Sequence, residues 1–214
     1  LEQFIKIVQR ELHAQARICS VSPHNPVQVE HLPYPWQLLG TGNYAAVFAH
    51  PHYPAYAVKI YAPSRPGLAT EVEVYRRIGD HPAYSQCFYT QSNFLILKRL
   101  RGNTLYDCLQ RGIPIPARAI QAVDSALNYA TTQGLNPRDV HGKNVMMHEG
   151  RGRVVDISDF LGPGSGSAWS DFKAFYYWIY RPLLAPLRIR IPGVLLNLTR
   201  QTYRLFRTLT RRQA

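Results

Sequence analysis

The chain has 214 residues, of which 46% are hydrophobic and 12% aromatic, and its formal net charge at pH 7 is +12. This composition fits a folded protein of one domain with a sizeable core and excludes a disordered chain. Three scattered cysteines, Cys19, Cys87 and Cys108, lack metal-ligand spacing, so we expect reduced core thiols in a cytoplasmic protein. The uncharged residues 32–58 contain four prolines, and we expect no transmembrane segment.

The N-terminal part of the chain predicts a helix followed by strands. Residues 3–16 are amphipathic, with Phe4, Val8 and Leu12 on one side of the helix. A loop with prolines follows, and we expect strands from about Val27.

A glycine-rich turn lies between the next two β-prone runs. The sequence LGTGNYAAVF at residues 39–48 is followed by AVKI at residues 57–60. Glycine at positions 40 and 42 lets backbone N–H groups approach an anion without interference from a Cβ atom. Lys59, on the strand after the turn, adds a fixed positive charge. These features together predict a cover for nucleotide phosphates.

A buried strand and two helices are predicted in the middle of the chain. The apolar run FLIL at residues 94–97 predicts a strand that enters a glycine-containing connection and then a helix. Residues 116–133 predict a further amphipathic helix, which delivers the chain to Asp139.

Two acidic motifs follow this helix. The run RDVHGKNVMM at residues 138–147 places Asn144 five positions after Asp139. The run VVDIS puts Asp156 at the end of a short apolar strand. Asp159 is the rival position, but it lies farther from Asn144 and beyond the apolar strand, so we favour Asp156.

In this order, the motifs resemble those of the protein kinase-like superfamily over about residues 36–160. The resemblance implies an α+β, two-lobed fold with an antiparallel-sheet N-lobe and a reduced helical C-lobe. It predicts a single kinase-like domain over residues 1–214. The N-lobe, with its N-terminal helix, would reach about residue 97, and the minimal C-lobe would end in a basic helix.

The resemblance also implies ATP and Mg²⁺ as cofactors. Asp139 would orient the acceptor hydroxyl, and Lys59 would contact the α- and β-phosphates. A glutamate from the predicted helix around residues 70–78 would hold Lys59. The motif selects Glu71, and Glu73 is the second choice, better explained as helix surface.

The remaining implied roles concern the nucleotide and the metal. Oxygen ligands suit Mg²⁺, and the resemblance assigns them to Asn144 and Asp156. His141 and Lys143 are candidates for phosphate contact, and Leu97 would lie deepest in the pocket. The implied nucleotide-binding set is Gly40, Thr41, Gly42, Asn43, Val47, Ala57, Lys59, Leu97, Lys98, Arg99 and Leu100.

The sequence departs from the family pattern in several places. Ala45 replaces the third loop glycine, and Pro137 replaces the histidine before Arg-Asp. Only 58 residues follow Asp156, without an Ala-Pro-Glu motif, which makes the C-lobe similar to those of the RIO, Bud32-like and lipopolysaccharide-sugar kinases. Asp171 is expected to cap the next helix, or alternatively to brace the catalytic loop from a buried position.

Charge is concentrated in the C-terminal part of the chain. From Phe172 onward there are nine Lys or Arg residues and no Asp or Glu. A docked helix with a solvated arginine face explains this pattern, and so does a surface for an acidic protein, a phosphorylated substrate, nucleic acid or an anionic membrane. The predicted helix has arginines at 200, 204, 207 and 211 and leucines at 195, 198, 205 and 209.

The sequence therefore predicts an ATP- and Mg²⁺-dependent phosphotransferase in the cytoplasm or at a membrane periphery. A serine/threonine protein kinase without a conventional activation segment is the favoured function, with a protein as substrate. A kinase of small molecules or glycans is the alternative. A nucleotide-binding scaffold or ATPase is the second alternative.

Overall fold

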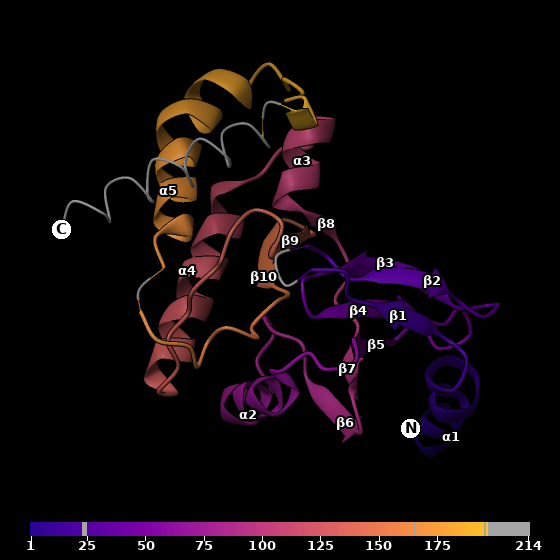
Figure 1. Cartoon of the computed structure of the whole chain (residues 1–214). Coiled ribbons are helices and arrows are strands. Elements are labelled where there is room, and N and C mark those ends of the chain that lie inside the picture. The colour runs from indigo at the N-terminus through magenta and orange to yellow at the C-terminus, as the bar shows by residue number, and fades with distance from the viewer. Residues whose placement is uncertain (23–24, 165, 195, 197–214) are drawn as a thin grey trace.

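The computed structural model describes residues 1–22, 25–164, 166–194 and 196, and it has the two-lobed fold that the motifs predict (Figure 1). A sheet-rich lobe lies on one side of the molecule and helices α3, α4 and α5 lie on the other. The elements are α1 (Glu2–Ile7), η1 (Val8–His13), β1 (Arg17–Cys19), β2 (Gln28–His31), β3 (Gln37–Thr41), β4 (Ala45–Ala49), β5 (Tyr56–Tyr61), α2 (Leu68–Ile78), β6 (Cys87–Gln91), β7 (Phe94–Lys98), β8 (Asn103–Thr104), α3 (Leu105–Arg111), α4 (Ala117–Thr132), β9 (Val145–His148), β10 (Arg151–Val154), α5 (Ala168–Phe175) and η2 (Tyr176–Leu184).

The N-lobe is built on a five-stranded antiparallel sheet with the order β3-β4-β5-β7-β6. Its register pairs Val47 with Lys59 and Ala57 with Leu97. Because alternate residues of a strand point to opposite faces, these four residues share one face of the sheet. That face turns toward α2 and the C-lobe.

The N-terminal helix covers the opposite face of the sheet. Phe4, Val8 and Leu12 are fully buried and pack in one cluster with sheet residues such as Phe48 and Ile96. The predicted helix is therefore present, and its second half, η1, has the wider π-helical form. The expected start of the strands was wrong, because hairpin strand β1 begins at Arg17.

The C-lobe packs around α4. A small sheet with the order β10-β9-β8 lies against this helix, and a Cβ atom on Gly152 would lie 2.3 Å from the carbonyl oxygen of Ala119. Glycine at this position therefore lets β10 approach α4 closely. Helix α3 begins with a capping box between Thr104 and Asp107. One hydrophobic cluster runs from the inner face of the N-lobe sheet into this lobe.

Helix α5 is held by Asp124 of α4, which accepts a hydrogen bond from the indole of Trp169 at 2.7 Å and pairs with Lys173 at 2.9 Å. The sequence assigned a cap or a buried brace to Asp171, and both assignments were wrong. The residue at the N-cap is Ser167, and Asp171 is exposed in the first turn of the helix. No pattern in the sequence of α4 identified Asp124 as the residue that holds α5.

The three cysteines are free thiols. Cys108 is buried, and burial raises its pKa to about 11. Cys19 and Cys87 are only partly buried, so the expectation of core thiols is correct for Cys108 alone. None of the helices in the described ranges combines the length and the apolar composition that crossing a bilayer requires. The leucines and arginines of the predicted basic C-terminal helix lie outside the described residues.

Candidate active site

A cavity of about 590 Å³ lies between the two lobes, a size within the usual range for small-molecule sites. It is lined by the β3–β4 turn, the inner face of β5, the connection after β7, and the residues that flank β9 and β10. All the residues of the predicted nucleotide-binding set line this cavity, and so do Lys143, Asn144 and Asp156. Glu71, Asp139 and His141 are not part of its wall.

The glycine-rich turn forms the roof of the cavity. A Cβ atom on Gly40 would meet no atom within 4 Å, and one on Gly42 would lie 3.9 Å from the carbonyl oxygen of Ala45. Neither glycine has a positive φ angle, so the local fold does not require glycine at these positions. The missing side chains leave room in the cavity for a ligand that approaches the backbone.

Lys59 lies at the centre of a buried charge cluster. Its Nζ is 2.8 Å from the carboxylate of Glu71 and 3.6 Å from Oδ1 of Asp156. The hydroxyl of Tyr61 donates a second hydrogen bond to Glu71, which is fully buried (0% exposed). Burial alone would lower the pKa of Lys59, but Asp156 and Glu71 outweigh it and hold this pKa above its usual value. The ammonium group therefore stays protonated.

Asp156 opens onto the cavity, since its side chain is 41% exposed. Burial would raise its pKa, but the charge of Lys59 and hydrogen bonds from Ser158 outweigh burial and lower the pKa. The Ser158 hydroxyl donates to Oδ1 of Asp156 at 2.9 Å. The rival Asp159 is absent from the cavity wall. Its pKa is raised, mainly by burial and to a smaller extent by the charge of Asp139.

The loop between α4 and β9 carries Asp139. This residue has a φ of +55°, and its carbonyl oxygen accepts a hydrogen bond from Nδ2 of Asn144 at 3.1 Å. Its carboxylate is 54% exposed and lies 3.8 Å from Nε2 of His141. The N–H of Val155 donates to the carbonyl oxygen of Asn144 at 3.0 Å, which ties this loop to the segment that follows β10 and carries Asp156.

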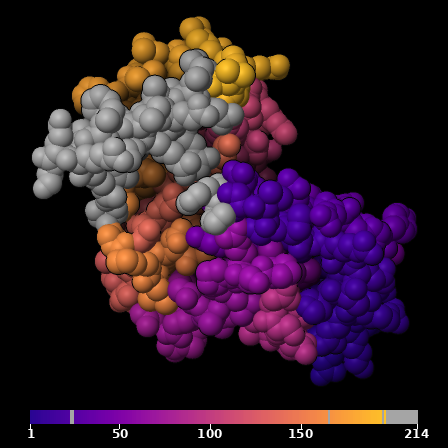
Figure 2. Space-filling model, in the orientation of Figure 1, coloured from indigo at the N-terminus to yellow at the C-terminus, as the bar shows by residue number. Residues whose placement is uncertain are grey.

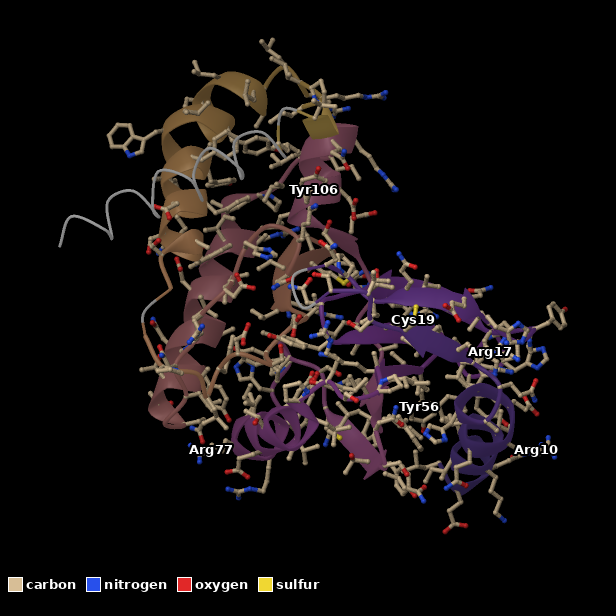
Figure 3. All side chains as sticks on the ribbon, in the orientation of Figure 1. Arg10, Arg17, Cys19, Tyr56, Arg77 and Tyr106 are labelled. Carbon is tan, nitrogen blue, oxygen red and sulfur yellow. The ribbon has the colours of Figure 1, made fainter. Side chains whose placement is uncertain are left out.

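Lys143 and His141, the candidates for phosphate contact, are positioned differently. The Nζ of Lys143 lies 4.4 Å from the ring centroid of Tyr106, which is on α3 (Figure 3). Lys143 also lines the cavity, whereas His141 lies beside Asp139 outside it.

Residues 157–167, which we call the return segment, lead from Asp156 to α5. Asn136 binds this segment through its backbone N–H, which donates to Phe160 at 2.7 Å. Its side-chain Nδ2 donates to the carbonyl oxygens of Gly162 and Gly164 at 3.1 and 2.6 Å. Arg138 donates to the carbonyl oxygen of Pro163. Two residues shortly before Asp139 in the loop, Asn136 and Arg138, thus fasten the described part of the return segment.

The connection after β7 provides fewer free backbone groups than the sequence suggested. The N–H groups of Lys98 and Arg99 donate to the carbonyl oxygens of Gln86 and Ala55, both at 2.8 Å. The carbonyl oxygen of Lys98 accepts from Ser85 Oγ at 2.7 Å. Among the described residues, no hydrogen bond uses the N–H of Leu100, which also lies at the cavity wall.

Sequence reasoning missed several residues of the site. Tyr61, Tyr75, Ser85, Met146 and Ser158 line the cavity without having been predicted. Tyr61 had a detectable signal, because it lies two residues after Lys59 and must share its face of β5. Ser158 lies only two residues after Asp156 and donates to it. The other three depend on how distant elements pack, which no local pattern reveals.

The chain is similar to proteins that are named as kinases. No family model matches the chain. A Bacillus subtilis (strain 168) protein named "Putative serine/threonine-protein kinase YrzF" is 32% identical over 170 residues, which cover 78% of this chain and 78% of that protein. A solved mutant of the Mycobacterium tuberculosis PknI kinase domain aligns with a TM-score of 0.45 and 22% identity over 57% of each chain. Because it is 32% identical to the Bacillus protein over 78% of its length, the chain belongs to the protein kinase-like superfamily.

Proposed function

We propose that this chain is an ATP- and Mg²⁺-dependent kinase that phosphorylates serine or threonine hydroxyls of a protein. The observation that carries this proposal is the position of Lys59. It lies at an interlobe cavity, held by a fully buried glutamate and facing a partly exposed aspartate. Phosphoryl transfer depends on positioning and charge neutralisation, and these groups are arranged to supply both.

The residues of the cavity suit a nucleotide. The open space beside Gly40 and Gly42 would admit phosphate oxygens close to the backbone, and Lys59 would contact them. Ala57 and Val47 would enclose the base from the N-lobe side, and the N–H of Leu100 would donate to it. Bound ATP would supply the phosphoryl group, while Mg²⁺ would neutralise the charge of its phosphates.

Asn144 and Asp156 suit the metal. Both present oxygen atoms at the cavity wall, and Mg²⁺ is bound in such sites by one or two protein oxygens together with phosphates and waters. In the described ranges, no group of three His, Cys, Asp or Glu residues forms a complete metal site. This donor set favours an ion that arrives with the nucleotide over a resident one.

Asp139 would orient the acceptor hydroxyl and accept its hydrogen bond. Its carboxylate is exposed beside the cavity, and its backbone is held by Asn144. Interactions made only in the transition state change turnover without changing ground-state affinity. Asp139→Asn should therefore bind ATP–Mg²⁺ within a few-fold of the unchanged chain and lose about two orders of magnitude in transfer rate.

The test is a nucleotide titration beside a transfer assay with labelled ATP and a broad panel of protein acceptors. Label on serine or threonine in protein, lost in Asp139→Asn, would support the proposal. Equal loss of nucleotide binding and transfer would make Asp139 a structural residue. Hydrolysis or binding without transfer to any acceptor would favour a nucleotide-binding scaffold or ATPase.

One observation favours a second candidate, a kinase of small molecules or glycans. The return segment has only eleven residues before α5 begins at Ala168, which leaves little chain for a peptide platform. The same labelled assay distinguishes the two, because label would then appear in the small-molecule or glycan pool and not in protein.

A further inference from the structure

Exposed apolar side chains are concentrated near the end of the described chain. Of the fourteen large hydrophobic residues that are exposed in the described ranges, seven lie between residues 177 and 194. Large apolar patches on a protein surface usually mark an interaction site. The seven are Tyr177 (39% exposed), Trp178 (80%), Ile179 (45%), Leu183 (59%), Leu187 (73%), Ile189 (39%) and Val194 (72%), and we call them the apolar edge.

The apolar edge is held on a fixed support. On the inner side of η2, the hydroxyl of Tyr176 donates to the carbonyl oxygen of Ile115 at 2.9 Å, and the N–H of Ile115 donates to the hydroxyl of Tyr180 at 3.1 Å. Farther along, the N–H of Ile191 donates to the carbonyl oxygen of Leu109 at 3.0 Å. These bonds fix the inner side of this part of the chain against the C-lobe. The exposure of the apolar edge therefore belongs to an anchored segment.

Positive charge accompanies the apolar edge. Arg181, Arg188 and Arg190 are exposed among its residues, and no Asp or Glu occurs from Phe172 to the end of the sequence. Five further arginines follow in the sequence after residue 196. Residues 177–194 therefore combine exposed apolar and cationic side chains, and this segment contains no acidic residue.

We propose that the apolar edge and its arginines bind the surface of an anionic lipid membrane. Trp and Tyr favour the membrane interface, where the ring is buried and the polar end reaches water. Arginine can bury its methylene groups beside acyl chains and keep its guanidinium at the phosphate level. A second copy of the chain is a poorer occupant, because a two-fold contact would bring arginines of both copies together.

The position of this surface keeps the active-site cavity accessible. The orange and yellow atoms at the top of Figure 2 belong to this part of the chain, on the opposite side of the molecule from the indigo N-terminal lobe. In the described ranges, no residue after Ser158 lines the cavity. A membrane on the apolar edge would therefore leave the cavity open to its ligands.

The experiment is sedimentation of the full chain with phospholipid vesicles. One set consists of phosphatidylcholine alone, and the other also contains anionic phosphatidylglycerol. We expect binding to the anionic vesicles, a weaker interaction in high salt because the charges are screened, and little binding to phosphatidylcholine alone.

Substitutions test the residues. Trp178→Ser should weaken binding about tenfold or more, because it removes a large apolar group that the membrane would bury. Arg181→Gln should weaken it about fivefold, the usual contribution of one basic residue near an anionic surface. Tyr34→Ser is the matched control, since Tyr34 is 96% exposed on the N-lobe and should not change binding. Thermal melting checks that all three variants fold.

Three results would overturn the proposal. The first is equal binding of Trp178→Ser and the unchanged chain to anionic vesicles. The second is an absence of preference for anionic over zwitterionic vesicles. The third is self-association of the chain that Trp178→Ser abolishes while vesicles bind neither protein, which would assign the apolar edge to a second copy.

Discussion

Helix α2 carries two glutamates that are two residues apart and that form ion pairs of nearly equal length. Glu71 lies 2.8 Å from Lys59 and is fully buried. Glu73 lies 2.6 Å from Arg76 and 2.8 Å from Arg77, on a surface where its side chain is 32% exposed. Figure 3 shows Arg77 at the side of α2 toward the end of α4, where its guanidinium donates to the carbonyl oxygen of Gly134 at 3.4 Å.

The two ion pairs differ in the contacts that hold them and in their contribution to the stability of the fold. Exposed ion pairs are screened by water and contribute little to stability, whereas removing one partner of a buried pair leaves a charge without solvent. Glu71 also accepts the Tyr61 hydroxyl, so its position is defined by two partners from one strand. The distance between charged atoms therefore says little about an ion pair until burial is known.

The largest expected effect comes from Lys59→Met. The methionine fills the slot but cannot neutralise phosphate charge, so turnover should fall by about two to three orders of magnitude. The carboxylate of Glu71 would stay buried without its cation, and we expect the free energy of unfolding to fall by about 3 kcal/mol.

The double variant Lys59→Met with Glu71→Gln separates these two effects. It should recover part of the stability, because the buried charge is gone, and none of the turnover. Turnover near that of the unchanged chain in either variant would remove Lys59 from the mechanism. The measurements are steady-state transfer and urea unfolding of the nucleotide-free proteins.

The second prediction concerns the other carboxylate near Lys59. Asp156→Asn should abolish the Mg²⁺-dependent rise in melting temperature that nucleotide produces, because it removes an anionic oxygen from the cavity wall. Asp159→Asn is the matched control and should keep most of this rise, since Asp159 does not line the cavity. The reverse result would assign the metal ligand to Asp159 instead of Asp156.

A smaller effect is expected for Glu71→Gln alone. Lys59 would keep Asp156 as a partner at 3.6 Å, so the loss of stability should be about 2 kcal/mol, less than for Lys59→Met. Turnover should fall about tenfold, because the lysine loses the group that holds its position. A loss of stability larger than that of Lys59→Met would contradict the assignment of Asp156 as the second partner.

The smallest effect belongs to Glu73→Gln. Hydrogen bonds from Arg76 and Arg77 lower the pKa of Glu73 from its ordinary 4.5 to about 2. A lowered pKa stabilises the folded state above the unfolded value, and this contribution disappears as pH falls from about 4.5 to 2. Because these surface ion pairs are screened by water, the contribution is small, so at pH 7 the melting temperature should fall only slightly and turnover should be unaffected. Carboxyl NMR titration would show a rise of this pKa in high salt. A pKa that stays at the ordinary 4.5 in low salt would contradict the pairing.

The sequence predicted those parts of the molecule that depend on local pattern. The glycine turn, the strand with Lys59 and the helix with Glu71 follow from periodicity and motif order, and the fold they imply is confirmed. The strand before Asp156 is also present, but it ends at Val154, two residues earlier than expected. Their roles, the single domain over residues 1–214 and the likeness to RIO, Bud32-like and lipopolysaccharide-sugar kinases stay predictions.

The sequence failed where pairing between distant residues decides the outcome. Strand β1 has three residues and forms only because β2 pairs with it, so no run of apolar alternation marks it. Asp171 has the residue type of a cap, but the chain turns earlier and places Ser167 there. The backbone of Lys98 and Arg99 looked available until Gln86 and Ala55 were seen to accept from it.

The N-terminal helix has a consequence for how this protein would fail. The sheet face beneath α1 and η1 is largely apolar, with Phe48, Val58, Ile60 and Ile96 fully or nearly fully buried. Cleavage in the short link between His13 and Arg17 would release this cover and leave the cavity on the other face of the sheet complete. The cleaved protein would expose a wide hydrophobic sheet and should aggregate, so insolubility would appear before any defect in the active site.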